Sequence, residues 1–184
     1  TQPGITIDNL NRHLSKYGLF FTPDPSTSSR ANVGGAIGNN SCGAHSILYG
    51  KTVDQVLEME IILSNGNKIL CAENSLNELK TKLSLQSFEG LVYKRVVDIS
   101  TQAAPEVKSR YPKILRRIGG YNLDLIHQSE PVNLSKIIVG SEGTLASVSE
   151  AKLKLETIPK VKAVSIFHFD NIYKSMEASV EILR

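Results

Sequence analysis

The glycine-rich run RANVGGAIGNNSCGAHSILYGKT, residues 30–52, holds five of the chain's thirteen glycines. Glycine loses more conformational freedom on folding than any other residue and brings no side chain to a core. The run is therefore a poor helix and a poor strand, so something other than its own packing must compensate. Two interpretations remain open: the glycines form tight turns in a structural loop, or they let a ligand approach the main chain closely.

The ligand interpretation rests on spacing. Gly34, Gly35 and Gly38 follow a turn rich in hydroxyl side chains and are spaced as at the start of a helix. Backbone N–H groups at such a start can point outward together and bind an anion. The run lacks the G-x-G-x-x-G fingerprint of dinucleotide-binding folds and the G-x-x-x-x-G-K-[ST] of P-loops. It therefore predicts a backbone cradle that belongs to neither class.

Composition excludes several other functions. The 184 residues carry 21 basic and 18 acidic side chains and no tryptophan, which argues against nucleic acid as a partner. Cys42 and Cys71 form neither a disulfide framework nor a metal-ligand spacing, so we expect no metal site and a reducing, cytoplasmic location. The apolar runs are too short to cross a bilayer, so we expect no transmembrane segment.

The first part of the chain alternates short elements. Thr6 can cap a helix that Gly18 ends, and a buried strand follows, stopped by Pro23. The two apolar runs of residues 53–72 flank the turn SNGN. This pattern predicts a β-hairpin in which Asn65 and Gly66 adopt positive φ.

The second part predicts a helical excursion followed by strands. Residues 73–117 read as helices, with Pro105 in a first helical turn. Three strands are predicted after these helices: the apolar run KIIV at 136–139, the alternating residues after the turn GSEG, and residues 161–170. A helix is predicted for the last residues. The expected fold class is α+β, a mixed β-sheet flanked by helices with a helical insertion at about 73–117.

Two separated motifs resemble one family. The first is P-D-P-S-T-S…A-N-V-G-G…N-N…G…Y-G-K-T-V-D-Q-V, and the second is VGSEGTLAS at 139–147. Together they resemble the FAD-binding domain of the vanillyl-alcohol oxidase/p-cresol methylhydroxylase superfamily. The nearest likeness is to its branch of glycolate oxidases and D-lactate dehydrogenases, the FAD-linked oxidases. The resemblance runs from about Gln2 to Pro159.

The resemblance implies a domain organisation. Residues 1–160 would be the larger, C-terminal part of an FAD-binding domain of type 2, the PCMH type. Residues 161–184 would be the first strand and helix of a substrate or cap domain. The chain is then expected to be truncated at both ends, with a further glycine-rich loop upstream and the rest of the cap downstream.

The resemblance also assigns non-covalently bound FAD to particular residues. The turn at 25–28 and the loop at 31–43 would line the diphosphate and the isoalloxazine, with the N–H groups of Gly34 and Gly35 on phosphate. The residues after Gly140 would approach the adenosine end. The expected cofactor contacts are Pro25, Ser26, Thr27, Ser28, Ala31, Gly34, Gly35, Gly38, Asn39, Asn40, Ser41, Cys42, Gly43, Tyr49, Gly50, Asp54, Ser141, Glu142, Gly143 and Val148.

By the same resemblance, the longer protein would oxidise a D-2-hydroxy acid of the lactate or glycolate type by hydride transfer to flavin N5. Its base would lie in the cap, so no catalytic residue is assigned here and the fragment alone would be inactive. Electrons would pass to a quinone, a cytochrome or an iron–sulfur domain, with the protein cytoplasmic or peripheral to the inner membrane. Two alternatives stay open: a UDP-N-acetylenolpyruvoylglucosamine reductase-like flavoprotein, and a non-catalytic flavin-binding or interaction fragment.

Three charged side chains beside these motifs have two interpretations each. His45 could tether FAD covalently, or it could be a solvent-facing or hydrogen-bonded histidine, which is the default. Arg116 and Arg117 could reach a substrate carboxylate in a bidentate manner. Solvated charges at a helix end are the favoured interpretation of the two arginines.

Overall fold

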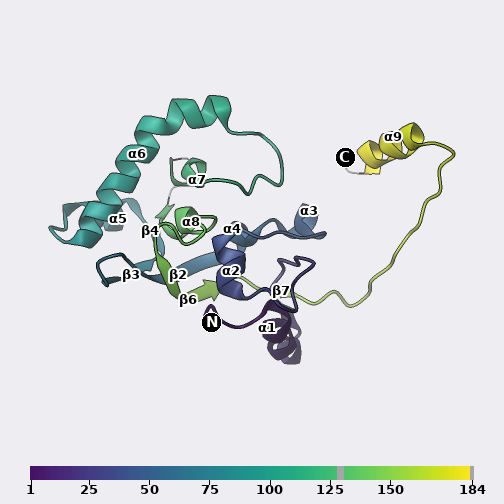
Figure 1. Ribbon diagram of the computed structural model, residues 1–184, viewed down its shortest axis with the longest axis horizontal. Helices are drawn as coiled ribbons and strands as arrows, with labels where there is room; N and C mark the ends of the chain where they lie inside the picture. Colours follow the sequence, from purple (N-terminus) through teal and green to yellow (C-terminus); the bar gives the residue numbers. More distant parts are fainter. Residues whose placement is uncertain (128–130, 183–184) are drawn as a thin grey trace.

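A three-stranded antiparallel sheet in the order β3-β2-β6 forms the centre of the fold (Figure 1). The structure is a computed structural model and describes residues 1–127 and 131–182. Strand β2 (Val56–Ile62) pairs with β3 (Lys68–Cys71) on one side and with β6 (Ser147–Leu153) on the other.

Strand β2 buries Val56, Met59 and Ile61. Strict alternation cannot place Val56 and Met59, three residues apart, on one face of a sheet. The pairing with β6 shifts register between Val56 and Glu58, as a β-bulge does, and the extra residue restores both side chains to the core face.

Two short antiparallel ladders lie outside this sheet. Strand β1 (Leu19–Phe20) pairs with β7 (Glu156–Thr157), and β4 (Glu73–Asn74) pairs with β5 (Val132–Asn133). The helices are α1 (Ile7–Leu14), η1 (Ser15–Tyr17), α2 (Val33–Gly38), α3 (Ser46–Tyr49), α4 (Thr52–Gln55), α5 (Leu76–Ser84), α6 (Phe88–Arg110), α7 (Leu123–His127), α8 (Ser135–Ile138) and α9 (Ile172–Ile182).

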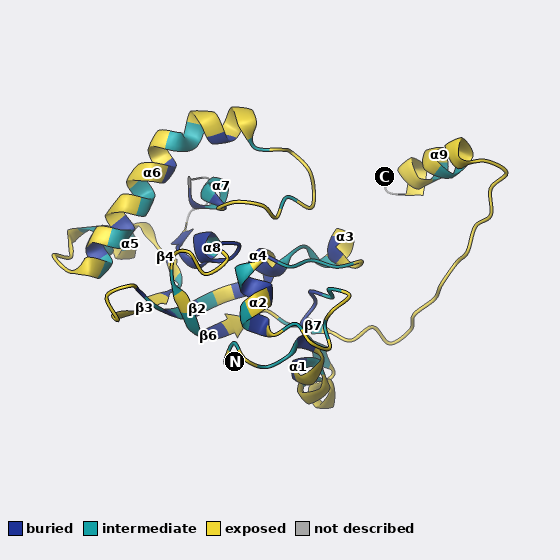
Figure 2. Ribbon diagram, in the orientation of Figure 1, coloured by how far each residue is buried: buried dark blue, intermediate teal, exposed yellow. Residues whose placement is uncertain are grey.

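The core lies between the central sheet and helices α2, α6 and α8, which Figure 2 shows as the darkest part of the ribbon. Tyr93 anchors the long helix α6, with its side chain fully buried. The Asn74 side-chain amide lies 3.4 Å from the Tyr93 hydroxyl and also donates to Val132 O. Burial raises the pKa of Tyr93 to about 12 and that of the Cys71 thiol to about 12, so both groups stay protonated at neutral pH.

The α+β class is confirmed, with one correction to the sheet. Every strand pair in the described residues is antiparallel, whereas a mixed sheet was predicted. The helix capped by Thr6 and the hairpin are confirmed, although only Gly66 of the turn has positive φ.

Several predicted elements are wrong in type or extent. The apolar run KIIV lies in helix α8, because a buried helical turn and a buried strand look alike in so short a run. The insertion is helical only over α5 and α6: Glu73–Asn74 is a strand, and residues 111–117 form a loop. Residues 161–170 form no strand.

Pro105 lies inside helix α6 instead of starting a new one. A proline in a helix interior removes one hydrogen bond and crowds the preceding turn. We therefore expect Pro105→Ala to raise the free energy of unfolding by about 1–3 kcal/mol. Urea denaturation measures the change, and Gln102→Ala in the same helix is the control that should change little. A loss of stability in Pro105→Ala would contradict the expectation.

Residues 160–171 leave the rest of the fold as an extended arm that carries α9 (Figure 1). Apolar side chains along it, including Val164, Ile166 and Met176, are largely exposed. The predicted cap-domain identity of residues 161–184 stays a prediction, and its last two residues lie outside the described part. Among residues 1–127 and 131–182, no helix is long and apolar enough to span a bilayer.

Candidate functional site

The structure brings the two sequence motifs together at the C-terminal end of α2. The N–H of Gly140 donates to Ile37 O at 2.9 Å, and that of Glu142 donates to Gly38 O at 3.0 Å. A Cβ on Gly38 would lie 3.8 Å from Glu142 Cα, so the two backbones pass close to one another. Gly140, Glu142 and Gly143 all have positive φ, which folds the GSEG turn back onto the helix.

The backbone N–H groups of Gly34 and Gly35, at the N-terminal end of α2, already have acceptors within the chain. The N–H of Gly34 donates to Pro3 O at 2.8 Å, and that of Gly35 donates to the N-cap Asn32 Oδ1 at 2.6 Å. These are the groups that the sequence assigned to phosphate, and in this structure both already have an acceptor. A Cβ on Gly34 would lie 2.7 Å from Pro3 Cβ, so this glycine serves close packing. Cofactor contact at both positions remains a prediction.

Asn40 follows α2 and is fully buried, with φ of 48°. Its Oδ1 accepts a hydrogen bond of 3.0 Å from Val53 N, which ties the glycine run to helix α4. Its Nδ2 has no partner among the described residues. Buried amide groups almost always find a partner, so an unpaired donor at this position is unusual.

Other unpaired buried atoms surround the same run. Thr22 Oγ1, Ser46 Oγ and Gln55 Oε1 lack a hydrogen-bond partner in the described part of the chain, as does Asn40 Nδ2. Among the described residues, the one further atom of this kind is Ser135 Oγ. A bound FAD has carbonyl, hydroxyl and phosphate oxygens and ring nitrogens that could pair with such groups. The chemical character of these unpaired groups is therefore compatible with that cofactor.

Asp24 shapes the next part of the run. A Cβ on Gly43 would overlap both Oδ1 and the backbone carbonyl of Asp24, so no other residue fits there. Asp24 Oδ2 lies 2.5 Å from His45 Nδ1, and Oδ1 accepts a hydrogen bond of 3.3 Å from His45 N. His45 is thus a hydrogen-bonded histidine, which agrees with the default interpretation.

Tyr49 and Gly50 lie at the end of the glycine-rich run, and Asp54 lies in helix α4, directly before strand β2. Tyr49 packs edge-on against Phe20 with ring centroids 5.5 Å apart. Gly50 has φ of 77°, and Asp54 Oδ2 accepts a hydrogen bond of 2.7 Å from Lys51 N. Their contact with a cofactor remains a prediction.

Four further predicted contacts belong to the glycine-rich run, namely Ala31, Asn39, Ser41 and Cys42, and the rest lie in two other places. The turn at 25–28 packs on the start of α1, where Asp8 N donates to Ser28 O at 3.3 Å. Val148 lies in β6 opposite Ile61. Among the described residues, no hydrogen bond joins this turn to Ser141, Glu142 or Gly143.

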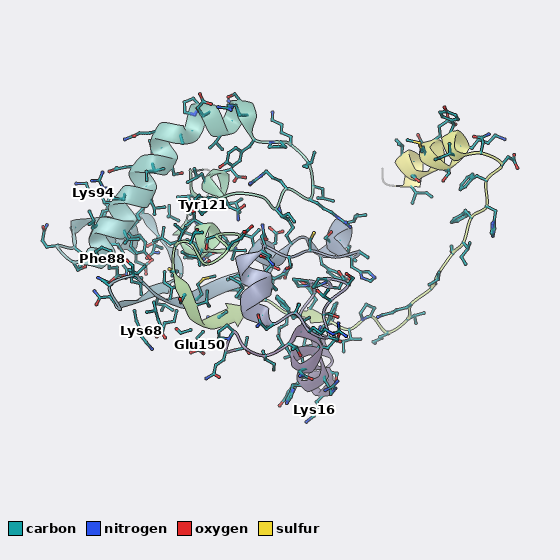
Figure 3. All side chains as sticks on the ribbon, viewed as in Figure 1. Lys16, Lys68, Phe88, Lys94, Tyr121 and Glu150 are labelled. Carbon is teal, nitrogen blue, oxygen red and sulfur yellow. The ribbon has the colours of Figure 1, made fainter. Side chains whose placement is uncertain are left out.

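The sequence missed the loop between α6 and α7, which bridges both motifs. Arg116 Nη2 donates to Gly43 O at 2.9 Å, and Lys51 Nζ donates to Arg117 O at 3.2 Å. At the other motif, the hydroxyl of Tyr121, labelled in Figure 3, lies 2.8 Å from Thr144 Oγ1. The stretch RRIGGYN carries these contacts. Its two adjacent glycines were the feature of the sequence from which a turn at this place could have been predicted.

Arg117 is not a solvated helix-end charge. Its Nη2 lies 2.6 Å from Asp124 Oδ1, and its guanidinium stacks 4.7 Å from the Tyr111 ring centroid. Only 12% of its side chain is exposed. Lys136 is a second half-buried cation, and burial lowers its pKa while its Nζ donates to Val53 O and Val56 O.

No group of three or more metal-ligating side chains occurs in the described residues. Residues 1–72 match the profile of a family described as FAD binding domain. The similarity of this part of the chain is therefore to FAD-binding domains, as the first motif indicated.

Relatives extend the similarity beyond the matched residues. D-2-hydroxyglutarate dehydrogenase of Escherichia coli is 35% identical over 173 residues, which cover 92% of this chain and 17% of the relative. Glycolate oxidase subunit GlcD of Bacillus subtilis is 26% identical over 182 residues, which cover 99% of this chain and 28% of the relative. The chain therefore spans about a sixth to just over a quarter of the length of these curated relatives.

The fold is also similar to a solved structure. A structure of alkyldihydroxyacetonephosphate synthase superposes with a TM-score of 0.50 and 19% sequence identity, over 87% of this chain and 19% of that one. At this identity the likeness concerns the fold alone.

Proposed function

We propose that this chain is the FAD-binding part of a flavoenzyme that oxidises a D-2-hydroxy acid. The observation that carries the proposal is the docking of the GSEG turn on the end of α2, which brings the second motif against the residues that match the FAD-binding domain. The unpaired buried atoms of Thr22, Asn40, Ser46 and Gln55 around the glycine run support it. The dehydrogenases and the glycolate oxidase among the relatives support the substrate class.

When bound, FAD would accept the hydride from the hydroxyl-bearing carbon, which is chemistry that no side chain supplies. The chain's own part is to bind and orient the cofactor. Gly38 leaves the most room beside its main chain among the glycines of residues 34–50, since the nearest atom to its Cβ position is Glu142 Cα at 3.8 Å. The Asp24–His45 pair and Arg116 fix the loop beside it. The residues that we propose for contact are those assigned from the motifs.

In the longer protein, residues 1–160 would complete the FAD-binding domain, and residues 161–182 would begin the domain that covers the substrate. The base that takes the hydroxyl proton would lie in that domain. A quinone, a cytochrome or an iron–sulfur domain would receive the electrons, in the cytoplasm or at the inner membrane surface. The dehydrogenase relatives favour this function over the reductase-like alternative.

Two measurements test the proposal. The longer protein should carry the absorption bands of a flavin and reduce a dye with D-2-hydroxyglutarate, D-lactate or glycolate. The 184-residue chain should quench FAD fluorescence on titration without oxidising any of these acids. Quenching by the fragment with no turnover by the longer protein would instead favour the non-catalytic flavin-binding alternative. A longer protein free of flavin, even after incubation with FAD, would refute the proposal.

A further inference from the structure

The loop between α6 and α7 forms an open surface cavity of about 390 Å³. Arg116, Arg117, Ile118, Gly119 and Gly120 line it, together with the ring of Tyr111. The loop is fixed at both ends, because the Tyr111 hydroxyl donates to Tyr121 O at 3.0 Å and Arg117 pairs with Asp124. Its shape is therefore held by contacts within the chain.

The two arginines of this cavity differ in their partners. Arg117 is neutralised by Asp124. Arg116 donates to the carbonyl oxygens of Gly43 and Ala44, at 2.9 and 3.5 Å, both through Nη2. A guanidinium has five N–H donors, so most of the donors of Arg116 remain available, and its charge is balanced by no carboxylate in the described residues.

The backbone of the loop offers further donors. The N–H groups of Ile118, Gly119 and Gly120 donate no hydrogen bond in the part of the chain that the structure describes. Gly120 has φ of 76°, and nothing lies within 4 Å of where a Cβ on Gly119 or Gly120 would stand. Successive free N–H groups in a turn that includes a left-handed residue form an anion-binding concavity.

We infer that this cavity is an oxyanion site, in which the Arg116 guanidinium and the N–H groups of residues 118–120 bind a carboxylate or a phosphate. Arginine recognises both groups with two parallel hydrogen bonds. The inference deepens the proposed function and rests on it for the ligand's identity. Through Gly43 the site adjoins the FAD-binding run, so the oxyanion would be the substrate's carboxylate or the cofactor's phosphate.

The test uses the 184-residue chain without flavin, so its outcome is separate from that of FAD binding. Glutarate, a dicarboxylate, and inorganic pyrophosphate are titrated at low salt and followed by calorimetry and by amide chemical shifts. We expect saturable binding of one probe, with shifts centred on residues 116–120. Arg116→Gln should weaken it about tenfold or more, since a hydrogen bond to a charged group contributes about 1.5–3 kcal/mol.

Arg95→Gln is the matched control, because Arg95 is an exposed arginine on α6 without an ion pair in the described residues. It should leave binding unchanged. Preference for glutarate would identify a carboxylate site, and preference for pyrophosphate a phosphate site. Three results would overturn the inference: no binding of either probe, an equal loss of affinity in Arg116→Gln and Arg95→Gln, or unchanged amide shifts of Gly119 and Gly120.

Discussion

Gly43→Ala is expected to lower the free energy of unfolding by about 3 kcal/mol, at the upper end of the cost of overpacking. The added methyl group would overlap the backbone carbonyl of Asp24 as well as its carboxylate. The side chain could rotate away, but the carbonyl belongs to a segment fixed between Pro23 and Pro25. The clash must therefore move the main chain, and with it the loop that carries His45.

Chemical denaturation of the 184-residue chain measures this loss. Gly4→Ala is the matched control, since nothing lies within 4 Å of its Cβ position and its φ is not positive. We expect the control to change stability little. In the longer protein, Gly43→Ala should also reduce the flavin retained on purification. Equal stability of the two variants would show that the Asp24–Gly43 approach does not constrain the loop.

Asn40→Ala is expected to lower the free energy of unfolding by about 2–5 kcal/mol, the sum of two separate effects. Alanine at φ of 48° pays the penalty of the left-handed region, about 1–2 kcal/mol. Loss of Oδ1 leaves the buried N–H of Val53 without its acceptor, which costs about 1–3 kcal/mol.

Asn40→Gly separates these causes, because glycine adopts positive φ freely and lacks the same acceptor. We expect the glycine variant to be less destabilised than the alanine variant by about 1–2 kcal/mol, which is the penalty that alanine pays at positive φ. The greater entropy of glycine in the unfolded state offsets part of this difference. Thermal denaturation of both variants gives the comparison. Alanine and glycine variants as stable as the natural chain would mean that the Asn40 side chain is not needed to join α2 to α4.

Motifs with strict backbone demands were predictable from the sequence. The hairpin was predicted from the turn SNGN. The glycine-rich run and the GSEG turn, which dock on one another, were both recognisable as motifs from their glycines. Their meeting at Gly38 and Glu142 was not, because hydrogen bonds between distant backbone groups leave no trace in side-chain pattern. The family resemblance placed both motifs in one domain without predicting this contact.

Other errors came from tertiary structure overriding local preference. Pro105 reads as a helix start, yet α6 continues through it because its buried face is anchored on both sides of the proline, by Tyr93 and Val107. The N–H groups of Gly34 and Gly35 read as free donors, yet the segment at Pro3 and the cap Asn32 take them. Arg117 reads as solvated because its partner Asp124 lies on α7.

The docking of the GSEG turn on α2 joins two segments between which the whole of α5 and α6 intervenes. Such a closure must wait until that intervening chain has folded back, since ring closure over a long stretch is opposed by entropy. We therefore expect the cradle to be completed late in folding. A newly made chain would acquire affinity for its ligand only once both halves are assembled, and ligand capture would then act as a latch on the finished fold.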